Sequence, residues 1–186
     1  TLRRRLVSIS MIHKLKGHYL DTKHPIIVEN LMGIRRVKGS IQKGKKPILI
    51  NHLKSIINVI DEQNVEEIKK LRDRSIILVG FGGGFRRTEL ISIDYEDLEF
   101  VPEGLKINIR RSKTDQFGEG MIKGLPYFSN ETYCPVNSLK KWLEVSKIKT
   151  GPIFRRFSKG SILTEKRLTD QTVVLLMKEY LNLAGI

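Results

Sequence analysis

The sequence has almost no cysteine, since Cys134 is the only one among 186 residues. A single thiol cannot form a disulfide within the chain, which excludes the class of small, disulfide-stapled secreted proteins. The longest apolar stretch, residues 76–85, contains four glycines and is far shorter than the roughly 20 apolar residues of a membrane-spanning helix. We therefore expect a protein of a reducing compartment, the cytoplasm by default, with no membrane partner.

Cofactor motifs are also missing. The four histidines do not stand at metal-ligand spacing from cysteine or from carboxylates. The glycine run 82–84 lacks the Gly-x-Gly-x-x-Gly spacing of dinucleotide loops, and no Gly-Lys-Ser/Thr follows it. We expect neither a metal nor a nucleotide cofactor.

Acidic residues are in the minority. The chain carries 34 Lys and Arg against 20 Asp and Glu, a formal net charge of +14 and a pI near 10.0. This excess favours association with polyanions, either nucleic acid or an acidic membrane surface, although an ordinary basic surface gives the same composition.

Apolar periodicity predicts two short basic helices at the start of the chain. The first carries apolar residues from Leu2 to Leu15 near one face. The second begins near Pro25, a residue suited to the first helical turn, and ends before Gly39.

The segment that follows these helices predicts a domain boundary. Residues 41–47 are polar, cationic and interrupted by glycine and proline, which is the composition of a surface linker. We therefore place a first domain at residues 1–40, a linker at 41–48 and a second domain at 49–186.

The second domain is predicted to be helical with a small antiparallel sheet. Three helices are expected to be capped at their N-termini by Asn51, by Asn64 in a capping box with Glu67, and by Asp170. A fourth helix is expected to start at Pro135. Alternation of apolar and polar residues over 105–109 predicts a half-buried strand, and residues 121–127 complete a hairpin with it. The fold class is therefore α+β, predominantly α.

The run from Gly82 to Leu90 (GGGFRRTEL) closes one apolar helix pattern and opens another. Arg86 has the planar, bidentate fork that suits a phosphate, and the glycines allow close approach of the backbone. Glu89 stands three residues later, close enough on a helical turn to hold the guanidinium. The alternative is a glycine cluster that ends a helix, followed by an ordinary surface arginine.

A second cationic motif, residues 110–116 (RRSKTDQ), lies at the tip of the predicted hairpin. Lys113 there could deliver an ammonium group to a phosphate or to a leaving oxygen, or could simply be solvated. The candidate DNA-binding cations are Arg3, Arg4, Arg5, Arg35, Arg36, Lys38, Arg87, Arg110 and Arg111.

Taken in order, these segments resemble the tyrosine recombinase (phage integrase) family. The similar segments are 86–90 (the Arg-x-Ser/Thr-Glu-Leu box), 93–98, 112–120 (the lysine hairpin), 134–143 and 151–155. The resemblance implies that residues 1–40 are the end of a helical, SAM-like core-binding domain that clasps DNA. It also implies that residues 49–186 are part of a DNA breaking-rejoining catalytic domain.

The same resemblance implies the chemistry, which is site-specific DNA integration and recombination through a covalent phosphotyrosine, without metal or nucleotide. Arg86 would hold the scissile phosphate, Glu89 would support the site and Lys113 would protonate the leaving oxygen. The implied partners are double-stranded DNA and intact recombinase protomers, and the implied location is the cytoplasm, with the nucleoid when DNA is bound.

Three parts of the family pattern, the His-x-x-Arg pair, a further His or Trp and the tyrosine nucleophile, have no counterpart among the 186 residues. Tyr180 shares a helical face with apolar residues and is expected to pack in the core. We therefore expect a truncated, catalytically incompetent DNA-binding form. The alternatives are a non-catalytic module that binds DNA or a partner, and a decayed remnant with no present function.

Overall fold

The structure, a computed structural model, describes residues 2–39, 44, 47–111 and 120–186. The chain divides into two compact units, residues 1–47 and residues 48–186. The interpretation of residues 1–40 as a core-binding domain, 41–48 as a linker and 49–186 as a catalytic domain stays a prediction.

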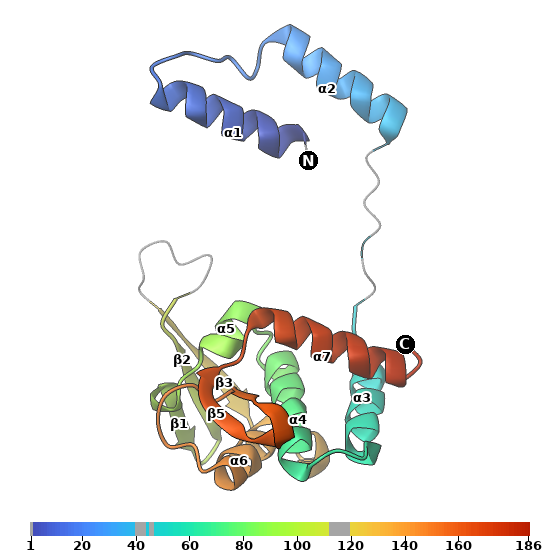
Figure 1. Cartoon of the computed structure of the whole chain (residues 1–186), viewed down its shortest axis with the longest axis vertical. Helices are drawn as coiled ribbons and strands as arrows, with labels where there is room; N and C mark the ends of the chain where they lie inside the picture. Colours follow the sequence, from blue (N-terminus) through green and yellow to red (C-terminus); the bar gives the residue numbers. More distant parts are fainter. Residues whose placement is uncertain (1, 40–43, 45–46, 112–119) are drawn as a thin grey trace. The chain divides into compact units, whose positions relative to one another are not determined.

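The first unit consists of two helices, α1 (Leu2–Leu15) and α2 (Pro25–Lys38) (Figure 1). Both ends of α2 agree with the sequence pattern, because Pro25 is its first residue and Gly39 follows its end with a φ of 71°. Neither helix contains a buried residue. Their apolar side chains only line a cavity of about 400 Å³ between them, so these two helices alone form no closed core.

The second unit contains five α-helices among its described residues. They are α3 (Ile50–Glu62), α4 (Glu67–Gly82), α5 (Arg87–Ser92), α6 (Pro135–Ser146) and α7 (Asp170–Leu183). Short 3-10 helices occur at Tyr95–Asp97, Glu131–Tyr133 and Lys159–Ser161.

Two small antiparallel sheets accompany these helices. The first has the order β1-β2-β3, with β1 at Leu98–Val101, β2 at Gly104–Ile109 and β3 at Met121–Pro126. The second pairs β4 (Arg155–Phe157) with β5 (Leu163–Arg167). The predicted hairpin is therefore β2-β3, and its register places Lys123 opposite Ile107.

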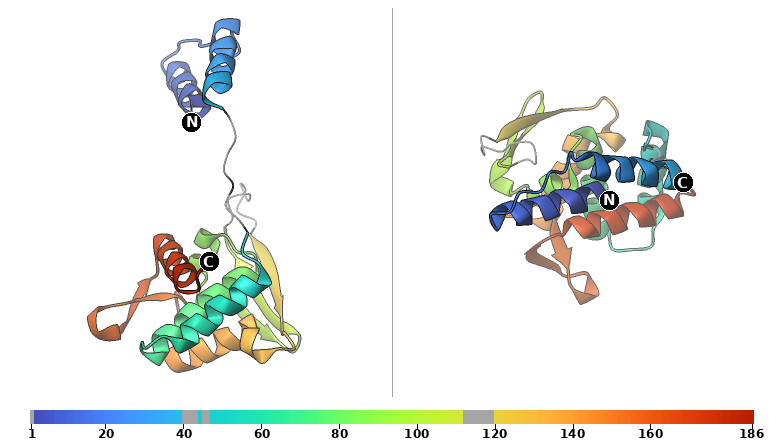
Figure 2. Two further views of the ribbon diagram at one scale, coloured as in Figure 1. Left: turned by 90° about the vertical axis from the view of Figure 1, so that its right-hand side faces the viewer. Right: turned by 90° about the horizontal axis from the view of Figure 1, so that it is seen from above.

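The core lies around α4, which packs against α3, α6 and α7 (Figures 1 and 2). Its middle segment, residues 75–79, is fully buried. Trp142 of α6 is also completely buried, and its indole Nε1 donates a hydrogen bond to the carbonyl of Ile153 at 2.8 Å. This bond ties α6 to the segment before β4, and Pro135, the first residue of α6, lies close to Gly82 at the C-terminal end of α4.

The predicted caps of three helices were wrong, although the helices themselves are present. His52 accepts a hydrogen bond from the backbone N–H of Leu49, so α3 begins one residue before Asn51. Thr169 caps α7 by accepting from the N–H of Thr172, which makes Asp170 the first helical residue. The N-cap of α4 is Glu66 and not Asn64.

Candidate nucleic-acid interface

The glycine run forms a turn that ends α4 and presents Arg86 at the start of α5. The N–H of Gly83 donates to the carbonyl of Val79, and the N–H of Phe85 donates to the carbonyl of Gly80. Gly84 adopts a φ of 54°, a left-handed conformation that glycine takes without steric cost. Arg86 then occupies the N-cap position of α5 with extended backbone.

Both carboxylate oxygens of Glu89 accept hydrogen bonds from Arg86. Carboxylate oxygen Oε1 lies 2.7 Å from the guanidinium Nη1, and Oε2 accepts from the backbone N–H of Arg86 at 3.0 Å. The Glu89 side chain is only 3% exposed, whereas that of Arg86 is 48% exposed. The contact expected from the three-residue spacing is thus present, and it leaves roughly half of the Arg86 side chain open to solvent. The catalytic roles of both residues stay predictions.

A third charged residue, Lys123 of β3, joins this pair. Its ammonium Nζ lies 3.7 Å from Glu89 Oε2 and donates to the carbonyls of Gly83 and Gly84 at 3.1 and 3.3 Å. The same Nζ lies 4.4 Å from the ring centroid of Phe85. Lys123 could not be singled out from the sequence, because a lysine in an alternating strand is expected to be exposed and its carbonyl partners lie about 40 residues earlier.

Arg110 is engaged by two carboxylates. Its Nε donates to Asp97 at 2.8 Å and its Nη1 donates to Asp94 at 3.0 Å. The hydrogen bond to Asp97, followed by the charge of that carboxylate, raises the pKa of Arg110. Because its charge is balanced by these two groups, Arg110 is a weaker candidate for a phosphate contact than its place in the sequence suggested.

Arg167 of β5 also binds Asp94, and it was not singled out from the sequence. Its guanidinium donates to the carbonyls of Ile91 and Ile93 at 2.6 and 3.5 Å, at the C-terminal end of α5. Arg167 therefore fastens the end of the helix whose other end carries Arg86. Together with Arg110, Arg111 and Thr88 it lines a cavity of about 400 Å³ beside Glu89.

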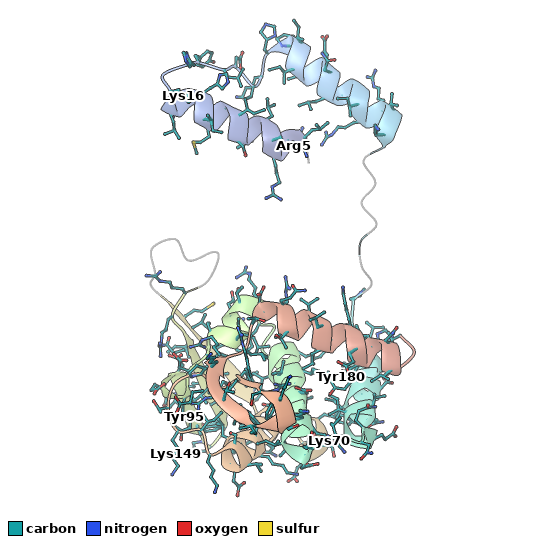
Figure 3. All side chains as sticks on the ribbon, in the orientation of Figure 1. Arg5, Lys16, Lys70, Tyr95, Lys149 and Tyr180 are labelled. Atoms are coloured by element: carbon teal, nitrogen blue, oxygen red, sulfur yellow. The ribbon has the colours of Figure 1, made fainter. Side chains whose placement is uncertain are left out.

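The other candidate cations lie in different surroundings. Lys113 is outside the described residues. Arg87 is half exposed and 4.0 Å from Asp170. The six candidate cations of the first unit are all exposed. Three lie on α1, namely Arg3, Arg4 and Arg5 (Arg5 is labelled in Figure 3). The other three lie in the last turn of α2, namely Arg35, Arg36 and Lys38.

Tyr180 lies in the core, as the helical pattern predicted. Tyr180, labelled in Figure 3, is 5% exposed. Its hydroxyl donates a hydrogen bond to Asp73 of α4 at 3.0 Å. Burial, reinforced by the neighbouring Asp73 charge, raises the pKa of the Tyr180 hydroxyl. A hydroxyl that is buried, hydrogen-bonded and harder to ionise is poorly suited to attack a phosphodiester.

The described parts of the chain contain neither a metal-binding cluster nor a membrane-spanning helix. No group of three or more His, Cys, Asp or Glu side chains there is arranged to hold a metal ion. No described helix has the length and apolar character needed to cross a membrane.

Comparison with known proteins identifies a curated relative of this chain. No protein-family model matches the chain. Over 189 aligned residues it is 40% identical to a protein described as "Integrase/recombinase xerD homolog" from Selenomonas ruminantium, covering 100% of this chain and 54% of that protein. The chain therefore spans about half the length of the curated relative it matches.

Three solved recombinase structures have a fold similar to that of this chain. The XerH site-specific recombinase bound to difH, in the pre-cleavage complex, matches 91% of this chain and 49% of its own with a TM-score of 0.53 and 19% identity. The post-cleavage complex with palindromic difH matches 78% and 38% at a TM-score of 0.53 and 18% identity. XerA recombinase matches 97% and 61% at a TM-score of 0.53 and 15% identity. These likenesses confirm the predicted α+β, mainly helical fold.

Proposed function

We propose that this chain, which belongs to the tyrosine recombinase family, binds double-stranded DNA and holds a backbone phosphate at Arg86, the arrangement on which site-specific recombination by the family depends. Its similarity to the integrase/recombinase homolog supports the family, and the geometry around Arg86 supports the role of the site. The proposed place of action is the cytoplasm, with the nucleoid when DNA is bound, and further recombinase protomers are proposed partners.

The observation that carries this proposal is the Arg86–Glu89 pair. A guanidinium held at one edge by a buried carboxylate has few accessible orientations, so it loses little entropy when a phosphate binds its exposed side. Transfer at a phosphodiester depends mostly on such fixed positive groups around the non-bridging oxygens. Lys113 is proposed as the general acid for the leaving oxygen, by the family resemblance.

The test compares Arg86→Lys with Lys14→Ala in binding to a fluorescently labelled DNA duplex at fixed salt. Arg86→Lys keeps the charge but loses the planar fork, so we expect it to weaken binding about tenfold more than Lys14→Ala, which removes one exposed cation of α1. Circular dichroism of both variants controls for folding. Equal affinities in well-folded variants would show that Arg86 is an ordinary surface arginine.

A further inference from the structure

We propose that Lys123 is a positioning residue of the phosphate site, which fixes the glycine turn and balances the charge of Glu89 so that Arg86 can engage a phosphate. This inference rests on the proposed function of Arg86. Lys123 is not itself proposed to contact the reacting atoms, and it acts through Arg86.

The first support is the number of groups that one ammonium contacts. Lys123 Nζ donates to the carbonyls of Gly83 and Gly84, which lie at the end of α4, where helix carbonyls lack intrahelical partners. It also faces the Phe85 ring at 4.4 Å, a cation–π distance. These contacts fix the three residues that immediately precede Arg86.

The second support is the charge balance at Glu89. A carboxylate that is 3% exposed must be compensated by nearby positive groups, because burial of an unpaired charge is strongly unfavourable. If Arg86 were the sole partner, a bound phosphate and Glu89 would compete for one positive charge. With Lys123 at 3.7 Å from Oε2, the three side chains sum to a net charge of +1, from two cations and one anion.

The side chain of Lys123 is 21% exposed, less than that of Arg86 at 48%. Both cations contact Glu89, Arg86 at 2.7 Å and Lys123 at 3.7 Å, and Arg86, the more exposed of the two, is the one that a bound phosphate can reach. This arrangement predicts that loss of Lys123 lowers DNA affinity only while Arg86 is present.

A double-mutant cycle tests this dependence with Lys123→Met, Arg86→Met and the double variant. The readout is affinity for a short labelled DNA duplex at fixed salt. We expect Lys123→Met to weaken binding about fivefold in the wild-type background and less than about twofold in the Arg86→Met background. A loss of the same size in both backgrounds would show that Lys123 contributes independently of Arg86 and would overturn the inference.

Two further variants separate the charge of Lys123 from its hydrogen bonds and from general surface charge. Lys123→Gln retains a donor for the glycine carbonyls without the charge, so we expect it to lose affinity as Lys123→Met does, with better retained thermal stability. If Lys123→Gln binds like wild type, charge balance is not the role of Lys123. Lys106→Met on the adjacent strand β2, where Lys106 pairs with Glu99 at the surface, is the matched control and should bind like wild type.

Failure of the inference differs from failure of the proposed function. If Arg86→Met itself binds DNA as tightly as wild type, the proposed function fails, whatever Lys123 does. If Arg86→Met weakens binding and Lys123→Met does not, the function stands and the role of Lys123 is overturned.

Discussion

Buried polar groups in the core of the second unit form a connected chain from α4 to α7. Arg72 donates from Nε to Asp73 Oδ1 at 2.8 Å, and its guanidinium lies 4.6 Å from the ring centroid of Phe157. The hydroxyl of Tyr180 donates to the other carboxylate oxygen of Asp73. Burial raises the pKa of Asp73, and Arg72 opposes that rise. Tyr180 thus serves structure by satisfying a buried carboxylate.

We predict that Tyr180→Phe destabilises the fold by about 1.5 to 3 kcal/mol at neutral pH, because it removes a hydrogen bond to a charged, buried group. Urea unfolding measures the change. The matched control is Tyr19→Phe, at a residue that is 90% exposed, which should leave stability unchanged. DNA affinity should not change in either variant, and a loss of affinity in folded Tyr180→Phe would contradict a purely structural role.

The penalty of Tyr180→Phe should also depend on pH. The pKa of Asp73 in the folded state lies above its ordinary value of 3.8, so the folded state binds the proton more tightly than the unfolded state does. The contribution of Asp73 to the free energy of unfolding therefore falls as the pH rises from 3.8 to the folded pKa. Tyr180 stabilises the ionised carboxylate. Its removal should therefore cost more above the folded pKa of Asp73 than below it, which unfolding at neutral and acidic pH would show.

At the scale of helices and strands, much of the fold follows from local sequence. Pro25 and Gly39 bound α2 because both have backbone preferences that act locally, and the alternation over 105–109 gave β2 for the same kind of reason. Exact caps did not follow, since a side chain such as His52 can cap as well as Asn51. The contacts of Lys123 and Arg167 were beyond local reasoning, because packing brings together residues about 40 and 76 positions apart.

Two glycines of the three-stranded sheet provide a matched test of its packing. Gly104 has a φ of 158°, and a Cβ added there would lie 2.0 Å from the carbonyl oxygen of Leu125. A Cβ at Gly124 would meet nothing within 4 Å. We predict that Gly104→Ala destabilises the protein by about 3 kcal/mol, whereas Gly124→Ala is neutral or stabilises it by about 0.5 kcal/mol.

Thermal unfolding of both variants measures this difference. Gly104 pairs with Pro126 at one end of the β2-β3 ladder, so the strain in Gly104→Ala should also disturb the register that places Lys123 beside Glu89. A Gly104→Ala protein as stable as wild type would mean that β2 and β3 lie farther apart at Gly104 than they do in this structure.

At the scale of the whole molecule, cations differ in how far their charge is already neutralised. Every ion pair among the described residues joins groups of the second unit, including those of Arg86, Arg110 and Lys123. The six candidate cations of α1 and α2 form no ion pair within the described parts of the chain. Cations without an acidic partner can neutralise phosphates without first breaking a pair.

This distribution predicts how DNA binding responds to salt. If roughly six phosphates are neutralised, the slope of log affinity against log salt concentration should be about −5, since each phosphate contact contributes roughly −0.9. Replacing Arg35, Arg36 and Lys38 with alanine should make the slope shallower by about 2.7 and weaken binding to all sequences alike. The matched control replaces three exposed lysines of the second unit, Lys141, Lys149 and Lys166, and should leave the slope within about one unit of wild type.

The cations of α2 stand in its last turn, where positive charge also stabilises the helix, so circular dichroism must show that the triple variant keeps its helical content. If the helix is intact and the slope still equals that of wild type, the first unit does not contact the phosphates. An equal decrease in slope for both triple variants would instead indicate nonspecific attraction by the net charge of the whole chain. A decrease confined to the α2 variant would place the phosphate contacts on the first unit, because counterions are released only where phosphates are neutralised.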